Sequence, residues 1–230
     1  LPEIYDSLYW KVQAFNPCHN ITESETNLFA QINLYSIEGL TLWLSAENVE
    51  IIDDKVNTWY DISGNDYHAT QTNTNSQPLL TNNHLNGNPV LSFDGINDYM
   101  TVDFEQAFEQ PNTYFIVWNI SAENSNTYFA FDGLVEENAQ ALYLRSTNQI
   151  TLHASIIAQI YSKTPPFSHI ISTAIFNGTE SQVFENGFFK GNGNAGNNSI
   201  TGMSIGARRT NFTLTLDGTI AEIIFFNSVL

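Results

Sequence analysis

The chain has 230 residues, of which 42% are hydrophobic and 13% aromatic, so it can fill a sizeable core and is not a largely disordered chain. Seven Lys and Arg residues stand against 24 Asp and Glu, and the resulting net charge of −17 argues against nucleic acid and anionic membrane surfaces as partners. A single cysteine, Cys18, rules out an intrachain disulfide, and no apolar stretch approaches the ~18 residues of a membrane helix, so we expect no membrane insertion.

Residues 1–38 differ in pattern from the rest of the chain. Residues 4–10 are rich in aromatic side chains, which are too apolar to stay solvated. Residues 24–34 are expected to form a short helix with apolar side chains on one face. We interpret residues 1–38 as an N-terminal arm or connector that docks on another domain or on neighbouring subunits.

From Leu40 onward the hydrophobic period becomes two, because Leu40, Leu42 and Leu44 alternate with Thr41 and Trp43. This alternation is typical of a strand with one buried face. Further strands are expected at residues 56–60, 89–93, 99–104, 113–120, 127–131, 141–145, 149–154, 169–176, 181–185, 188–190, 203–205 and 219–226.

The segments between these strands carry turn residues. Asn186-Gly187 separates two strand-like runs and predicts a tight hairpin, since a type I′ turn needs positive φ at both central positions. Asp217-Gly218 opens the last long strand in the same way. About a dozen short strands without a long helix predict an all-β domain of two packed antiparallel sheets over residues 39–230.

Five segments also carry a family likeness. They are residues 42–46 (LWLSA), 59–70 (WYDISGNDYHAT), 86–99 (NGNPVLSFDGINDY), 183–187 (VFENG), and 205–208 with 217–227 (IGAR and DGTIAEIIFFN). In this order they resemble laminin-G-like domains of the concanavalin A-like lectin and glucanase superfamily. The resemblance implies a two-sheet jelly-roll sandwich. It does not fix the function, because that superfamily includes sugar binders, adhesion domains, glycosidases and virion components.

Two acidic turns contain the densest oxygen ligands in the chain. Their side chains are Asp61, Asn65, Asp94, Asn97 and Asp98. Calcium takes six to eight such oxygens, and the resemblance implies that some family members bind it near these loops, at one edge of the sandwich. We predict that the two turns together hold one calcium ion. The alternative is that these side chains only cap their own turns.

Sugar sites combine an apolar platform with a few placed polar groups. Tyr67, beside Asn65, is a candidate platform for a sugar ring, and Tyr99 is a second one. The tryptophans Trp43, Trp59 and Trp118 fall on predicted strands and are expected in the core.

The carboxylates do not form a glycosidase pattern. Retaining glycosidases of this superfamily carry a strand-borne E-x-D-x-E, which places acid and nucleophile on one face, and no such string occurs here. The five histidines show no H-x-x-x-H or H-x-H pair that would indicate a metal site. We therefore predict that the chain is not an enzyme.

Two functions remain open. The first is a non-catalytic extracellular binding or adhesion module that recognises carbohydrate, a glycan or another cell-surface polymer. The alternative is a structural virion protein, such as a phage capsid or tail decoration, whose residues 1–38 anchor it to neighbouring subunits. The expected location is accordingly extracellular or on a virion surface.

Overall fold

The computed structural model describes residues 8–10, 13–15, 21–23, 27–29, 33–121, 127–145, 149–161 and 168–230. The chain divides into two compact units, Leu1–Ile37 and Glu38–Leu230. Among the described residues, no helix has the length and apolar character needed to cross a membrane.

The first unit contains short antiparallel ladders. β1 (Leu8–Trp10) pairs with β4 (Asn27–Phe29), and β2 (Gln13–Phe15) pairs with β3 (Ile21–Glu23). The helix expected over residues 24–34 is therefore wrong for Asn27–Phe29. A short apolar run is compatible with the periodicity of a helix or of a strand, and here pairing with β1 makes it a strand. Its residues 24–26 and 30–32 lie outside the described part, and Leu34–Ser36 forms a 3₁₀ turn, η1. The docking role of residues 1–38 stays a prediction.

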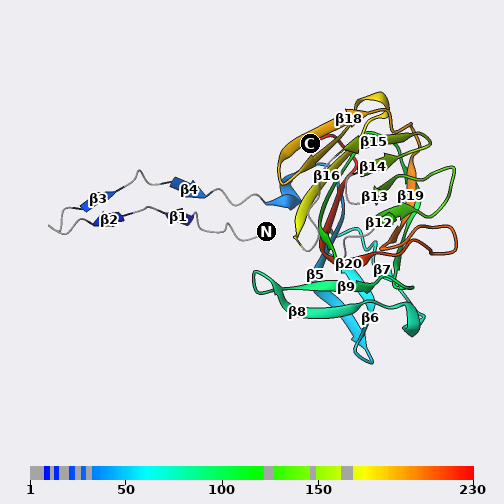
Figure 1. The fold of residues 1–230 in the computed structure, drawn as a ribbon, viewed down its shortest axis with the longest axis horizontal. Coiled ribbons are helices and arrows are strands. Elements are labelled where there is room, and N and C mark those ends of the chain that lie inside the picture. Colours follow the sequence, from blue (N-terminus) through cyan, green and yellow to red (C-terminus); the bar gives the residue numbers. More distant parts are fainter. Residues whose placement is uncertain are drawn as a thin grey trace. The chain divides into compact units, whose positions relative to one another are not determined.

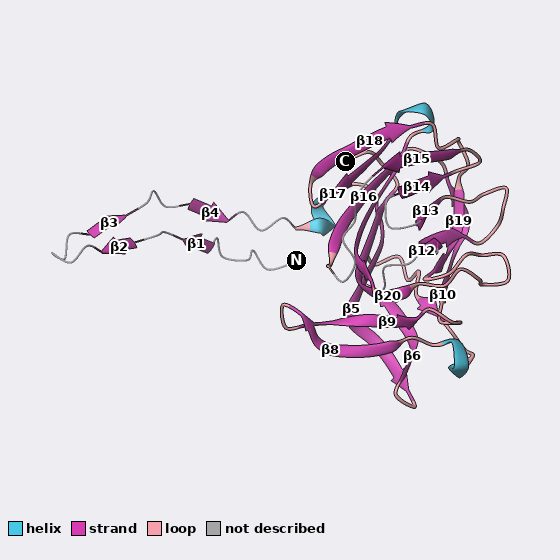
Figure 2. Ribbon diagram, viewed as in Figure 1, coloured by secondary structure: helices cyan, strands magenta, loops and turns pink. Residues whose placement is uncertain are grey.

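The second unit is built almost entirely of antiparallel strands (Figures 1 and 2). They are β5 (Leu40–Ile52), β6 (Lys55–Asp61), β7 (Ala69–Thr70), β8 (Leu79–Leu85), β9 (Asn88–Asp94), β10 (Met100–Phe108), β11 (Asn112–Ile120), β12 (Thr127–Gly133), β13 (Ala141–Arg145), β14 (Gln149–His153), β15 (Ile157–Tyr161), β16 (Ile170–Phe176), β17 (Ser181–Glu185), β18 (Phe188–Gly193), β19 (Ile200–Ile205) and β20 (Asp217–Phe226). Two further 3₁₀ turns are η2 (Thr74–Ser76) and η3 (Gly178–Glu180). The predicted all-β antiparallel sandwich is confirmed.

The strands follow one hydrogen-bonded path that folds over on itself. Its order is β15-β14-β13-β12-β19-β10-β7-β6-β5-β20-β11-β16-β17-β18. The short β7 pairs with both β10 and β6 and so joins the two layers at one edge. β20 lies between β5 and β11 and also pairs with β9, so it pairs with more strands than any other described element on this path.

Aromatic side chains fill the space between the layers. Tyr114 on β11 stacks on Phe225 of β20, with ring centroids 4.5 Å apart, and lies 4.7 Å from Phe131 of β12 in the opposite layer. Trp59 and Trp118 are fully buried, as predicted. Trp43 is only half-buried, and its indole N–H donates to a Glu222 carboxylate oxygen at 2.7 Å.

Candidate functional site

The first predicted metal turn is closed by hydrogen bonds of its own. The Asp61 carboxylate is buried and accepts from four donors: the backbone N–H of Trp43 and of Ser63 (both 2.9 Å), the Ser63 hydroxyl (2.8 Å) and the Tyr67 N–H (3.1 Å). The Asn65 amide donates to backbone carbonyls at the start of β5. Four donors fill the lone-pair sites of a carboxylate, so Asp61 acts here as a turn cap.

The second turn is similar but leaves one atom without a partner. The Asp94 carboxylate accepts from the N–H groups of Ile96 (2.8 Å) and Asn97 (3.1 Å), and the Asn97 amide donates to the Asn75 carbonyl (2.7 Å). Asp98 is 2% exposed; its Oδ2 accepts from the Asp94 N–H, while Oδ1 has no hydrogen-bond partner. Burial, and after it the charge of Asp94, raises the pKa of Asp98 from 3.8 to about 6.

The two turns do not meet. Asp94 pairs with Asp217 at the start of β20, whereas Asp61 pairs with Leu44, which pairs with Ile223. Asp217 and Ile223 are six positions apart on β20, which is about 20 Å of extended strand. The prediction that both turns hold one shared calcium ion is therefore wrong, because the positions on β20 to which the two turns are joined lie about 20 Å apart. Calcium as a cofactor of the chain stays a prediction. The described residues contain no group of three His, Cys, Asp or Glu side chains placed to hold a metal.

The two predicted sugar platforms already pack on other rings. Tyr67 lies edge-on to Phe104, with centroids 5.3 Å apart, and its hydroxyl accepts from the Gln106 amide. Tyr99 stacks on Phe212 with centroids 3.9 Å apart and ring planes 5° from parallel. Neither tyrosine lines the hollow described next, and their role in binding stays a prediction.

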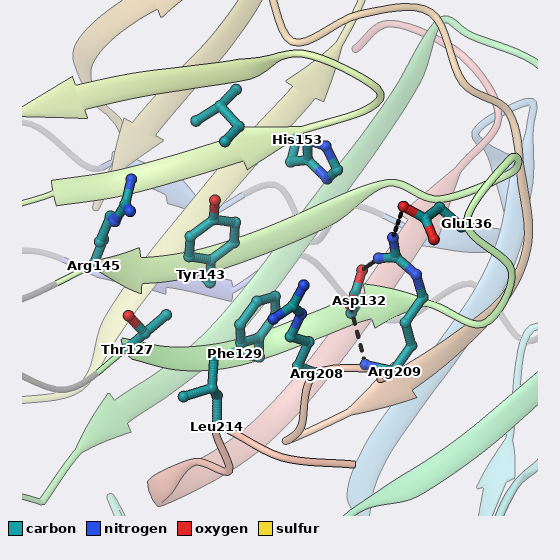
Figure 3. Close-up of a pocket in the computed structure, with 11 residues that line it drawn as sticks. Thr127, Phe129, Asp132, Glu136, Tyr143, Arg145, His153, Arg208, Arg209 and Leu214 are labelled. Carbon is teal, nitrogen blue, oxygen red and sulfur yellow. Dashed lines mark hydrogen bonds and ion pairs between the residues drawn. The ribbon is translucent and has the colours of Figure 1, made fainter. Parts of the chain in front are cut away.

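A hollow of about 370 Å³ lies on the outer face of β12, β13 and β14, where the loop between β19 and β20 borders it (Figure 3). Alternation along β13 turns Leu142 toward the core and Tyr143 outward. A bulge between Phe129 and Phe131 of β12 shifts the pairing by one residue, so that Asp132 lines the same hollow as Phe129.

The floor of the hollow is an aromatic pair. Phe129 and Tyr143 lie directly opposite each other in the ladder, with ring centroids 4.5 Å apart and planes 20° from parallel. Beside them Ala141, which pairs with His153 across β13 and β14, is buried in the same cluster as the two rings. The two rings therefore face each other, and with 6% of Phe129 and 9% of Tyr143 exposed they form an apolar floor beneath the hollow.

All three arginines of the sequence, Arg145, Arg208 and Arg209, line this hollow. Arg209 is 11% exposed, and its Nη1 lies 2.6 Å from Oδ1 of Asp132, which is 1% exposed; its backbone N–H donates to the other Asp132 oxygen at 3.1 Å. Glu136, 86% exposed, lies 3.9 Å from Arg209 Nη2. Arg145 and Arg208 are exposed, and neither forms an ion pair with any described residue.

The titratable groups leave the hollow positive at neutral pH. Burial raises the pKa of Asp132, while the Arg209 guanidinium opposes that rise. Burial, and then the charge of Arg209, lowers the pKa of His153, so this imidazole is neutral at pH 7. Burial also raises the pKa of the Tyr143 hydroxyl. Three arginines against the carboxylates of Asp132 and Glu136 leave one net positive charge in a chain of −17.

No protein-family model and no curated protein matches the chain. Among solved structures, it is similar to Trypanosoma rangeli sialidase in complex with sialic acid, with a TM-score of 0.59 and 15% identity, over 84% of this chain and 31% of that one. It is also similar to the receptor binding domain of botulinum neurotoxin D, with a TM-score of 0.57 and 15% identity, over 84% of this chain and 50% of that one. The chain thus spans about a third of the sialidase and half of the toxin domain structure.

At such identities the likeness shows the fold alone, an antiparallel β-sandwich. Membership of the laminin-G-like family stays a prediction.

Proposed function

We propose that this chain is a non-catalytic, extracellular carbohydrate-binding module and that the hollow over β12–β14 is its site. The observation that carries the proposal is a hollow whose apolar floor is the stacked Phe129–Tyr143 pair and whose walls hold three arginines and two carboxylates. The C–H groups of a pyranose can pack on such a floor, and the surrounding charged groups can hydrogen-bond its hydroxyls. A volume of about 370 Å³ suits a site of this kind.

The solved structures support this use of the fold by analogy. One of them is a sialidase in complex with sialic acid, and another is the receptor binding domain of a neurotoxin. The carboxylates of the hollow support the non-catalytic part. Asp132 is buried and held by Arg209, whereas Glu136 is exposed at the rim, and glycoside hydrolysis needs two carboxyl groups that flank the scissile bond.

Replacing Tyr143 by alanine tests the proposal. We expect glycans retained by the wild-type protein on an array to bind Tyr143→Ala about tenfold more weakly, since loss of a stacking ring costs about 1.4 kcal/mol. The bound glycan should also stay intact on incubation with the protein. Tyr99→Ala is the matched control, because Tyr99 also stacks on a phenylalanine but lies outside the hollow. Equal losses in both variants, or release of reducing ends, would contradict the proposal.

A second candidate function is that of a structural subunit in a virion or another surface assembly. The hairpin of β17 and β18 favours it, because Phe188 and Phe189 at its tip are 74% and 57% exposed. Ile171, which exchanges hydrogen bonds with the turn residue Asn186, is 46% exposed beside them. Adjacent exposed apolar side chains of this size are typical of a contact with another protein surface.

If this tip joins copies of the chain, the wild-type protein should sediment at a multiple of its 25.8 kDa mass. The double variant Phe188→Ser/Phe189→Ser should then sediment as a single chain, because the contact loses its apolar surface. Ile96→Ser, which removes an equally exposed apolar side chain from the turn after β9, should leave the assembly unchanged. A wild-type protein that sediments as one chain at all concentrations would decide against this candidate.

A further inference from the structure

All three arginines of this acidic chain lie around one hollow, although ion pairing within the chain does not require it. With 24 carboxylates in the sequence, an exposed guanidinium has many possible partners. Yet Arg145 and Arg208 form no ion pair within the described part of the chain, and they lie with Arg209 around one aromatic floor. Such concentrated cationic groups are placed to receive negative charge from outside the protein.

The ion pair beneath them fixes one of these groups in place. Asp132 accepts both from the Arg209 guanidinium and from the Arg209 backbone N–H, so it holds the start of the loop as well as the side chain. The neighbouring N–H of Arg208 donates to the Thr213 carbonyl at 2.8 Å. With the backbone of Arg208 and Arg209 held in this way, Arg208 lines the same hollow as Phe129 (Figure 3).

We infer that the sugar bound in this hollow is acidic, and that the Arg208 guanidinium holds its carboxylate or sulfate ester while the sugar ring packs on the aromatic pair. The inference rests on the proposed function and adds the chemical class of the ligand. The planar fork of a guanidinium matches a carboxylate or sulfate with two parallel hydrogen bonds. Arg145, at the other side of Tyr143, supplies a second cationic contact.

The whole-chain charge restricts the kind of anion. Nucleic acids and anionic bilayers carry dense negative charge, and the overall field of a protein of net charge −17 repels them. A volume of about 370 Å³ accommodates only a few sugar rings. The site therefore suits an isolated acidic residue, at a chain end or a branch, and not a uniformly charged polymer.

The test uses oligosaccharides in matched pairs, titrated calorimetrically into the purified chain. One pair ends in a uronic acid or in its carboxyl-reduced neutral form, and the other ends in a sulfated or an unsulfated hexose. We expect the acidic member to bind at least about tenfold more tightly, and Arg208→Gln to abolish that difference. Lys190→Gln removes the same charge outside the hollow and should preserve the difference.

Each outcome decides one point. A preference for the uronic acid or for the sulfate identifies which anion Arg208 holds. Equal binding of acidic and neutral members would overturn this inference and leave the proposed function standing, whereas no binding of either would overturn the proposed function. An acidic preference that survives Arg208→Gln would overturn the role given to Arg208.

Discussion

Arg209→Leu is expected to lower the free energy of unfolding by about 3 to 5 kcal/mol, because it leaves the buried Asp132 carboxylate without its partner. The Nη1–Oδ1 distance of 2.6 Å and the 1% exposure of Asp132 place this pair out of water. In the variant the Asp132 carboxylate stays out of water without a positive charge beside it, and the remaining hydrogen bond from the residue 209 N–H only partly offsets that cost. Urea denaturation at pH 7 measures the loss.

The loss should depend on pH with a defined sign. Without the guanidinium that lowers it, the pKa of Asp132 in the folded state rises further above its unfolded value. The folded variant then binds a proton at a pH where the unfolded chain does not, so the variant regains stability as the pH falls through that interval. Arg208→Leu is the control; it removes an exposed arginine without an ion pair and should change stability by less than about 0.5 kcal/mol. Equal destabilisation in both variants would show that the Asp132–Arg209 pair has no special role.

Asp98→Asn is expected to act in the opposite direction and stabilise the protein at pH 7 by about 1 to 2 kcal/mol. The wild-type protein carries there a 2%-exposed carboxylate with one unpartnered oxygen, and its pKa is raised from 3.8 to about 6. Between pH 3.8 and about 6 the folded state holds this proton and the unfolded chain releases it. Wild-type stability should therefore fall as pH rises through this window, and the variant should lack that slope.

Asp61→Asn provides the contrast for this second result. The Asp61 carboxylate accepts four hydrogen bonds, so an amide in its place should destabilise the fold.

Adding calcium tests whether the Asp98 turn binds the ion or is only a hydrogen-bonded turn with a buried charge. If the turn binds the ion, calcium raises the melting temperature of the wild-type protein and leaves Asp98→Asn unchanged. A variant less stable than the wild type in both calcium and chelator would refute the buried-charge argument.

The fold could be predicted largely because its signals are local. Asn186 and Gly187 have φ of 50° and 78°, which is the positive-φ pair that the hairpin prediction requires, and β20 begins at Asp217 as the Asp217-Gly218 step indicated. Residues 24–34 misled the prediction because three residues of pairing with Leu8–Trp10 outweigh a weak helical pattern. The conformation of a short apolar segment depends on the strand with which it pairs, and the segment's own sequence does not indicate which strand that is.

The candidate site could not be predicted in the same way. Asp61 and Asp94 each lie in a turn, as expected, but the distance between those turns is set by their pairing through β20 with strands far apart in sequence. The hollow depends on a bulge in β12 and on Arg208 arriving from a distant loop. One sequence signal did point to it: all three arginines of a very acidic chain fall at two places, position 145 and positions 208–209.

The position of β20 also bears on how the protein is made. This strand is the last of the fold to be synthesised, yet it joins β5 to β11 and also holds β9. Until Phe226 has left the ribosome, β5 waits for a partner nearly two hundred residues downstream, with its apolar face uncovered and one edge unpaired. Pairings of such sequence separation fold slowly, and open strand edges promote aggregation. The sandwich can therefore close only after β20 has been synthesised, and until then the nascent chain exposes unpaired strands that promote aggregation.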